Sequence, residues 1–294
     1  MLNLLTEVNN RKEWVLHRRY RVVHHPINNL YAAIINRIVY PITKRSVEVK
    51  ANLFFGTKLF CQLPANAHFF LFGMKSHDSE IRLTKYFIRN LKSKKVFFDI
   101  GAHVGFYSLL ANKIMGPGSK VVSFEASSQT FKWLQKNVGQ FENIQPVHAA
   151  VCNQSGEIDF IELPERFAED NSIYTTNKNL PLSKVTCLQL DNYCDSEKIY
   201  PEIIKMDVEG AEIEALLGMK TLLQSSKLIL VMEYWRDVKH KTGAQDNAKK
   251  ILFENGFKQF VIDDEGNLFE TNQSEMMMDK NHINSDNLVF MKMN

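Results

Sequence analysis

The chain has 294 residues, 45% of them hydrophobic, so it can bury the core of one large domain with or without an appendage. Its formal net charge of +3 is too small for a protein that binds nucleic acid through many phosphates, although local basic patches remain possible. The four cysteines form no CxxC pair, which argues against a disulfide framework or a zinc knuckle and fits a cytoplasmic location. The most apolar stretch, 30–42, is short and contains Arg37, and residues 1–16 lack a secretory signal, so no membrane span is expected.

Residues 1–90 are predicted to form an N-terminal extension that begins with a basic, helical segment. Its early basic residues are Arg11, Lys12, Arg18, Arg19 and Arg21. Apolar residues then recur at helical spacing over 27–38 and end near Pro41, which predicts an amphipathic helix. Two interpretations stay open: the helix covers the main domain, or it contacts a membrane surface or a partner.

The rest of the extension is predicted to be a β-hairpin followed by a helix. Residues 46–63 show two short apolar runs that turn near Gly56, which is typical of paired strands. Residues 77–91 have the pattern of a helix that leads into the main domain. We expect this extension to form one side of a site.

Residues 91–294 are predicted to form the main domain, in which buried strands alternate with amphipathic helices. Strands are expected at 96–100, 120–125, 143–151, 156–163, 184–190, 203–207, 228–235 and 287–293, with a hairpin over 260–269. The first three strands and the helices between them form a βαβαβ unit, which predicts a mostly parallel sheet with helices on both faces. The polar loop 164–183 is either a lid or an ordinary surface loop.

Acidic residues stand at the ends of four predicted strands, where ligands bind in an open parallel sheet. These residues are Asp99, Glu125, Asp207 and Glu233. One acid at a strand end usually caps the next turn, but four together favour a cationic ligand. The sequence therefore indicates a site with an excess of carboxylates.

A glycine turn, DIGAHVG, follows the first of these acids. It lacks the lysine of a P-loop, and with only Gly101 and Gly105 it lacks the GxGxxG pattern of a dinucleotide site. Asp99 would also repel a pyrophosphate, whereas S-adenosylmethionine has no phosphate and carries two cationic groups that carboxylates attract. Glu125 lies 24 residues after Gly101, where an acid can accept both hydroxyls of a ribose. The small Ala150 in the third strand would admit a flat adenine.

Several motifs resemble those of the FkbM family of S-adenosylmethionine-dependent methyltransferases. They are DIGAHVGFYS, FEASSQTFKWLQKN, HAAV, LQLDNY, KMDVEGAE and LVMEYW, and they span about residues 95–235 in the family's order. The resemblance implies a class I, Rossmann-like methyltransferase sandwich with a mostly parallel seven-stranded sheet. It also implies O-methylation of a hydroxyl on a sugar, a glycan or a secondary metabolite. Ala126 departs from the family's usual proline, and His103 stands where asparagine or histidine is common.

The resemblance assigns roles to individual residues. The first cofactor motif matches Asp99, Gly101, Ala102 and Gly105, the ribose acid matches Glu125, and the family's DVEG acids match Asp207 and Glu209. Glu209 could instead stabilise the following helix through its dipole. Candidates for the base that removes the acceptor's proton are Asp207 and Glu233, then His103 and His240. No metal requirement is expected, because the acids lack an evident third ligand at local spacing.

Two other functions remain open. An RNA or other nucleic-acid methyltransferase shares the fold, but the chain has no Asn-Pro-Pro-Tyr-like tetrapeptide and no Pro-Cys pair, so a nucleic-acid partner is not expected. A non-catalytic protein could keep the fold for contacts through the helix at 27–38, although intact acids at four strand ends argue against this. The expected acceptor is a small molecule or glycan with a free hydroxyl.

Overall fold

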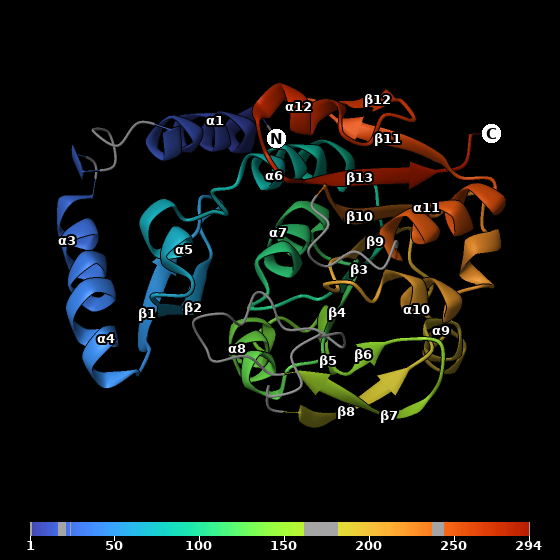
Figure 1. The fold of residues 1–294 in the computed structure, drawn as a ribbon, viewed down its shortest axis with the longest axis horizontal. Coiled ribbons are helices and arrows are strands. Elements are labelled where there is room, and N and C mark those ends of the chain that lie inside the picture. Colours follow the sequence, from blue (N-terminus) through green and yellow to red (C-terminus); the bar gives the residue numbers. More distant parts are fainter. Residues whose placement is uncertain (1, 17–21, 24, 162–181, 237–243, 294) are drawn as a thin grey trace.

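The computed structural model describes residues 2–16, 22–23, 25–161, 182–236 and 244–293. An eight-stranded sheet in the order β12-β11-β13-β10-β9-β3-β4-β5 forms its centre (Figure 1). Its strands are β3 (Val96–Ile100), β4 (Lys120–Glu125), β5 (Ile144–His148), β9 (Ile203–Met206), β10 (Ile229–Trp235), β11 (Lys258–Ile262), β12 (Leu268–Glu270) and β13 (Ser285–Met291). The strands from β10 to β5 pair in parallel, and β13, β11 and β12 pair antiparallel. The mostly parallel α/β sandwich is thus confirmed.

The prediction of seven strands was wrong by one strand. The short arm after the turn at Gly266 pairs with β11, where Phe260 lies opposite Glu270, and so extends the sheet by β12. The hairpin itself was predicted at 260–269, but its pairing with the main sheet through β11 and β13, which makes its second arm the eighth strand, is a contact between distant residues.

Helices cover both faces of the sheet. One face carries α6 (Asp78–Asn90), α7 (Phe106–Met115) and α8 (Ser128–Val138), and the other carries α9 (Leu190–Glu197), α10 (Glu212–Leu217), η3 (Leu222–Gln224) and α11 (Ala244–Glu254). Successive residues of a strand point to opposite faces, so Phe97 joins the first apolar core and Phe98 the second. The short helix α12 (Met276–Asn281) lies beside β11 and β13.

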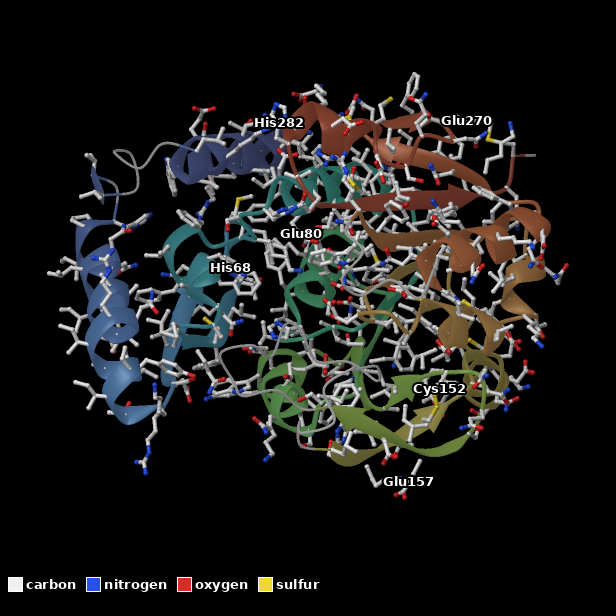
Figure 2. The ribbon with its side chains drawn as sticks, viewed as in Figure 1. His68, Glu80, Cys152, Glu157, Glu270 and His282 are labelled. Atoms are coloured by element: carbon white, nitrogen blue, oxygen red, sulfur yellow. A yellow bond between two sulfur atoms is a disulfide. The ribbon has the colours of Figure 1, made fainter. Side chains whose placement is uncertain are left out.

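A separate three-stranded sheet, ordered β6-β8-β7, lies beyond β5. Its strands are β6 (Ala150–Val151), β7 (Gly156–Ile161) and β8 (Leu182–Leu188). The parallel pairing of β6 with β8 brings Cys152 to Cys187, and a disulfide joins them with 6.0 Å between their Cα atoms (Figure 2). The cysteine spacing did not indicate this bond, because a separation of 35 residues carries no local signal.

The N-terminal extension forms helices and a hairpin, as expected. Its elements are α1 (Leu2–Leu16), α3 (Pro26–Ile34), η1 (Ile35–Val39), α4 (Tyr40–Thr43), β1 (Val47–Asn52), β2 (Lys58–Leu63) and α5 (Ala67–Phe72). The strands β1 and β2 pair antiparallel around Gly56, and α1 contacts α6. In the described part of the chain, no helix is long and apolar enough to cross a membrane. The loop expected at 164–183 lies almost entirely outside the described residues, as do Arg18, Arg19 and Arg21.

A buried ion pair fastens α6 to the C-terminal strands. Arg82 has no exposed surface, and its Nη2 lies 2.9 Å from Asp286 Oδ1 in β13. The same guanidinium donates to the carbonyl oxygen of Ile262 at 2.6 Å, and its Nε lies 2.8 Å from Asp78 Oδ2. This network fixes α6 against the main sheet.

Replacing Arg82 by methionine should lower the free energy of unfolding by about 3–5 kcal/mol, because Asp286 is left buried without its cation. The double variant Arg82→Met/Asp286→Asn should lose less than the sum of the two single variants, since it removes the uncompensated charge. Urea unfolding of the four proteins measures this. Additive losses would show that the two side chains act independently.

Candidate active site

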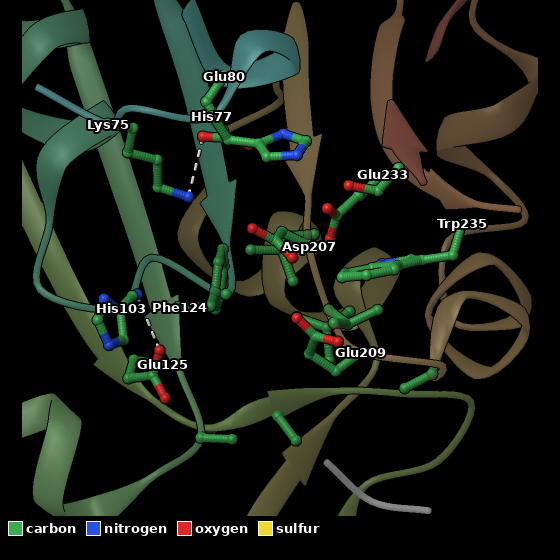
Figure 3. Close-up of a pocket in the computed structure, with 18 of the residues that line it drawn as sticks. Lys75, His77, Glu80, His103, Phe124, Glu125, Asp207, Glu209, Glu233 and Trp235 are labelled. Carbon is green, nitrogen blue, oxygen red and sulfur yellow. Dashed lines mark hydrogen bonds and ion pairs between the residues drawn. The ribbon is translucent and has the colours of Figure 1, made fainter. Parts of the chain in front are cut away.

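A cavity of about 590 Å³ opens at the carboxyl ends of β3, β4, β9 and β10 (Figure 3). Strand ends and the loops after them supply one wall, which includes Gly101, His103, Glu125, Ala150, Asp207, Glu209, Glu233 and Trp235. The extension supplies another, which includes His68, Lys75, His77 and Glu80. The volume of the cavity falls within the range of roughly 300–1,000 Å³ that is typical of small-molecule sites. As expected, the extension forms one side of the site.

In the wall formed by the strand ends, the glycine turn exposes backbone that no side chain covers. Gly101 has a φ of +74°, and a Cβ there would lie 1.8 Å from the carbonyl oxygen of Asp207, so no other residue fits. The backbone N–H groups of Gly101 and Ala102 both donate to the Phe124 carbonyl, at 3.0 and 2.9 Å. Ala102 is buried and Gly105 precedes α7, and neither is among the residues that line the cavity.

Glu125 ends β4 and faces the cavity. Its Oε2 accepts from the backbone N–H of His103 and its Oε1 from that of Ser127, both at 2.9 Å. Burial raises the pKa of Glu125 to about 7, although both hydrogen bonds favour the ionised form. Figure 3 places His103 beside Glu125 and apart from Asp207. Ala150 lines the cavity near this end, with Phe124.

Asp99 lies behind the wall. It is fully buried and is not among the residues that line the cavity. Ser108 Oγ donates to its Oδ2 at 2.6 Å, and Lys205 Nζ lies 3.8 Å from its Oδ1. Burial raises the pKa of Asp99, whereas Lys205 opposes that rise. The first strand-end acid therefore faces the interior and Lys205.

Asp207 and Glu233 point toward each other from neighbouring strands (Figure 3). Burial alone would raise the pKa of Asp207, but Lys205, whose Nζ is 3.1 Å from its Oδ2, and Lys75 lower it to about 2. Burial and the negative charges of Asp207 and Glu209 raise the pKa of Glu233 well above its usual value. The two pKa values shift in opposite directions, so Glu233, which hydrogen-bonds Asp207, binds a proton more readily and Asp207 stays ionised more readily.

Glu209 adds a third carboxylate to this pair. Oxygen atoms of Asp207, Glu209 and Glu233 lie within 4.8 Å of one another, so these three residues could hold a metal ion. The third ligand that the sequence spacing lacked thus comes from the turn after β9, where Glu209 has a φ of +48°. Lys205, 3.1 Å from Asp207, already offsets part of this negative charge, and the lack of a metal requirement stays a prediction.

The sequence did not identify the site residues on the extension side. Lys75 Nζ lies 2.9 Å from Glu80 Oε2, and the hydroxyl of Tyr107 donates to the same oxygen at 2.7 Å. Glu80 is buried in α6 together with neighbours that include Ser79, Arg82 and Lys85, so no local pattern distinguished it as a site residue. Trp235 follows the LVMEY run and lines the cavity. His240 lies outside the described residues.

Comparison with known proteins adds independent information. The family model for the methyltransferase FkbM domain matches residues 99–258. The hexuronic acid methyltransferase AglP of Haloferax volcanii is 24% identical over 159 residues, which cover 54% of this chain and 62% of that protein. Methyltransferase sdnD of Sordaria araneosa is 24% identical over 206 residues, which cover 58% and 77%.

Among solved structures, methyltransferase FkbM from Methylobacillus flagellatus shares 15% identity with a TM-score of 0.43. The match covers 68% of this chain and 43% of that one. The chain therefore spans less than two thirds of the length of both this protein and AglP.

Proposed function

The chain belongs to the FkbM family of S-adenosylmethionine-dependent methyltransferases, and we propose that it methylates a hydroxyl of a sugar, a glycan or a secondary metabolite. The observation that carries this proposal is the pair of carboxyl groups of Asp207 and Glu233, which lie together at the cavity wall, the first with a lowered and the second with a raised pKa. The carboxylate of Asp207 can accept a hydrogen bond from a neutral hydroxyl. The relative named for hexuronic acid supports a sugar as the acceptor.

The residues of the cavity fit S-adenosylmethionine. We propose that Glu125 accepts the ribose hydroxyls, that Gly101 allows close approach of the backbone, and that Ala150 borders the adenine. Glu209 and Asp207 would face the cationic amino-acid part. When bound, the cofactor supplies an electrophilic methyl carbon on a sulfonium.

Methyl transfer to a hydroxyl needs an aligned acceptor oxygen and a group that takes its proton. We assign that role to Asp207, because it lines the cavity and Lys205 lowers its pKa, which favours the ionised form, whereas the raised pKa of Glu233 favours the protonated form. Lys205 keeps Asp207 charged and fixes its orientation at 3.1 Å. Asp99 acts on the site through Lys205 as a positioning residue. His103, beside Glu125, belongs to the cofactor side.

The charges around the cavity disfavour a nucleic-acid acceptor. Glu80, Asp207 and Glu209 line it, and Lys75, which also lines it, pairs with Glu80 at 2.9 Å. Ionised carboxylates repel a phosphate backbone, which proteins normally bind with lysine and arginine.

Methyl transfer from labelled S-adenosylmethionine to a panel of acceptors tests the proposal. The panel contains oligosaccharides with hexuronic acid, neutral oligosaccharides and a short RNA, and mass spectrometry locates the methyl group. We expect label on a hydroxyl oxygen of a saccharide and none on RNA. Label on RNA alone would overturn the proposal, and cofactor binding without transfer to any acceptor would favour a non-catalytic protein.

The two acids of the pair should respond differently to isosteric amides. Asp207→Asn should lower kcat by about 10²–10⁴-fold, because the proton acceptor is lost. Glu233→Gln should lower kcat by less than about tenfold, since an amide N–H can replace the protonated carboxyl as donor to Asp207. Steady-state kinetics, with circular dichroism to verify folding, measures both. Equal losses would assign the proton transfer to the pair, and near-normal turnover of Asp207→Asn would remove that residue from the mechanism.

Cofactor affinity should fall as the pH drops below about 7, because Glu125 then takes up a proton and loses acceptor capacity. Because burial raises the pKa of Glu125 to about 7, cofactor affinity is lost as the pH falls through about 7 and is complete at higher pH. Glu125→Gln should bind about 10–100-fold more weakly and lack the pH dependence near 7. Calorimetry of S-adenosylmethionine binding measures this, with the exposed Glu142→Gln as matched control. An unchanged pH profile in Glu125→Gln would exclude Glu125 as its cause.

Activity should not change when the enzyme is assayed with EDTA, because Lys205 partly neutralises the three clustered carboxyl groups and the raised pKa of Glu233 favours its neutral form. Rates with EDTA, without it and after addition of Mg²⁺ test this. A loss that Mg²⁺ restores would show a metal at Asp207, Glu209 and Glu233.

A further inference from the structure

The continuous helix formed by α3, η1 and α4 carries an apolar stripe that faces solvent. Its members recur at helical spacing and remain exposed: Ile27 (80%), Leu30 (64%), Tyr31 (41%), Ile34 (40%), Ile38 (54%) and Ile42 (77%). Its other side buries Ala32, Ile35 and Tyr40 against the protein. The helix lies at one end of the molecule, away from the main sheet (Figure 1). Its packing on the extension therefore leaves the stripe uncovered.

An exposed row of apolar side chains along one helix face indicates a surface that binds another molecule or a membrane. Soluble monomers rarely leave a contiguous apolar patch of more than a few hundred Å² in water. Large apolar side chains scattered singly over a surface would need no explanation, but these follow one face of one helix. Tyr31, at the edge of the stripe, also contacts Phe70 of α5 with 6.0 Å between ring centroids, which ties the helix to the extension.

The charged residues around the stripe indicate which kind of surface it binds. Arg37, Lys44 and Arg45 are exposed, and Arg37 follows Ile34 by three positions, which places it on the flank of the stripe. The sequence has no Asp or Glu from residue 14 to residue 47. Apolar side chains bordered by cations alone match an anionic lipid surface. A second copy of the chain would bring the same cations face to face.

We propose that the helix 26–43 binds the surface of an anionic lipid bilayer. Its stripe enters the boundary between headgroups and acyl chains, while Arg37, Lys44 and Arg45 contact the anionic headgroups. The helix lies along the surface and the catalytic domain stays in water. Since α5 contacts α3 and also supplies His68 to the cavity, the bound helix holds that side of the cavity at a fixed distance from the bilayer.

Vesicle flotation with the full chain tests the proposal. The vesicles contain phosphatidylcholine alone, or phosphatidylcholine and phosphatidylserine at about 7:3. We expect binding to the anionic vesicles, at least about tenfold weaker binding to the neutral ones, and a decrease with added salt. No binding to the anionic vesicles would overturn the proposal, and so would equal binding to both kinds.

Two pairs of variants separate the stripe from the charges. Ile27→Ser/Ile38→Ser should weaken binding at least about tenfold, whereas the control Phe269→Ser/Met293→Ser, also at exposed apolar positions, should not. Lys44→Glu/Arg45→Glu should weaken it by a similar factor, whereas the exposed control Lys220→Glu/Lys227→Glu should change it less. Unchanged binding by both helix variants would overturn the proposal.

Two further measurements distinguish a loss of membrane binding from a loss of folding or activity and from self-association. Circular dichroism and the methyl-transfer rate in solution should match the wild type for both helix variants, since none of these positions lines the cavity. Sedimentation velocity measures self-association. Dimers of the wild type that disappear in Ile27→Ser/Ile38→Ser, without vesicle binding, would assign the stripe to a second copy of the chain and overturn the membrane proposal.

Discussion

Lys205 places a buried ammonium group behind the cavity, 3.1 Å from Asp207 Oδ2 and 3.8 Å from Asp99 Oδ1. Carboxylates deprived of water would otherwise bind protons instead of staying ionised. Burial disfavours the charge on Lys205 as well, but Asp207 and Asp99 raise its pKa above the ordinary value. The cation and the acids thus stabilise one another's ionised states across strands β3 and β9. Without Lys205, the wall of the cavity would lose the charge pattern on which its chemistry depends.

This arrangement separates the pKa values of the two acids. Lys205 lowers the pKa of Asp207, whereas burial and the charges of Asp207 and Glu209 raise the pKa of Glu233. Two chemically identical groups on adjacent strands thereby take opposite roles. On the extension side, Lys75 likewise keeps Glu80 ionised, because it lowers a pKa that burial would raise. The ion pair of Arg82 with Asp286 holds α6, and with it Glu80, against the main sheet.

The regular part of the fold follows from local patterns in the sequence. Buried strands alternating with amphipathic helices predicted the parallel sheet, and Gly56 and Gly266 marked both hairpins. The glycine turn and three of the four strand-end acids reach the cavity, because parallel strands end at one edge of a sheet. The fourth, Asp99, points inward to Ser108 and Lys205. Position along a strand can be inferred from sequence, but the surroundings of a side chain cannot.

Local sequence patterns predicted the succession of strands and helices along the chain, the cofactor turn with its acids, and the apolar period of the helix at 27–38. These properties depend on neighbours a few positions apart, whose geometry the backbone fixes. Only the tertiary structure decided that Lys75 and Glu80 face the same cavity as Glu233 and that Cys152 meets Cys187. It also decided that the apolar stripe of that helix faces solvent. Contacts between distant residues, and the burial that sets each pKa, exist only once the chain has packed, so no local pattern can contain them.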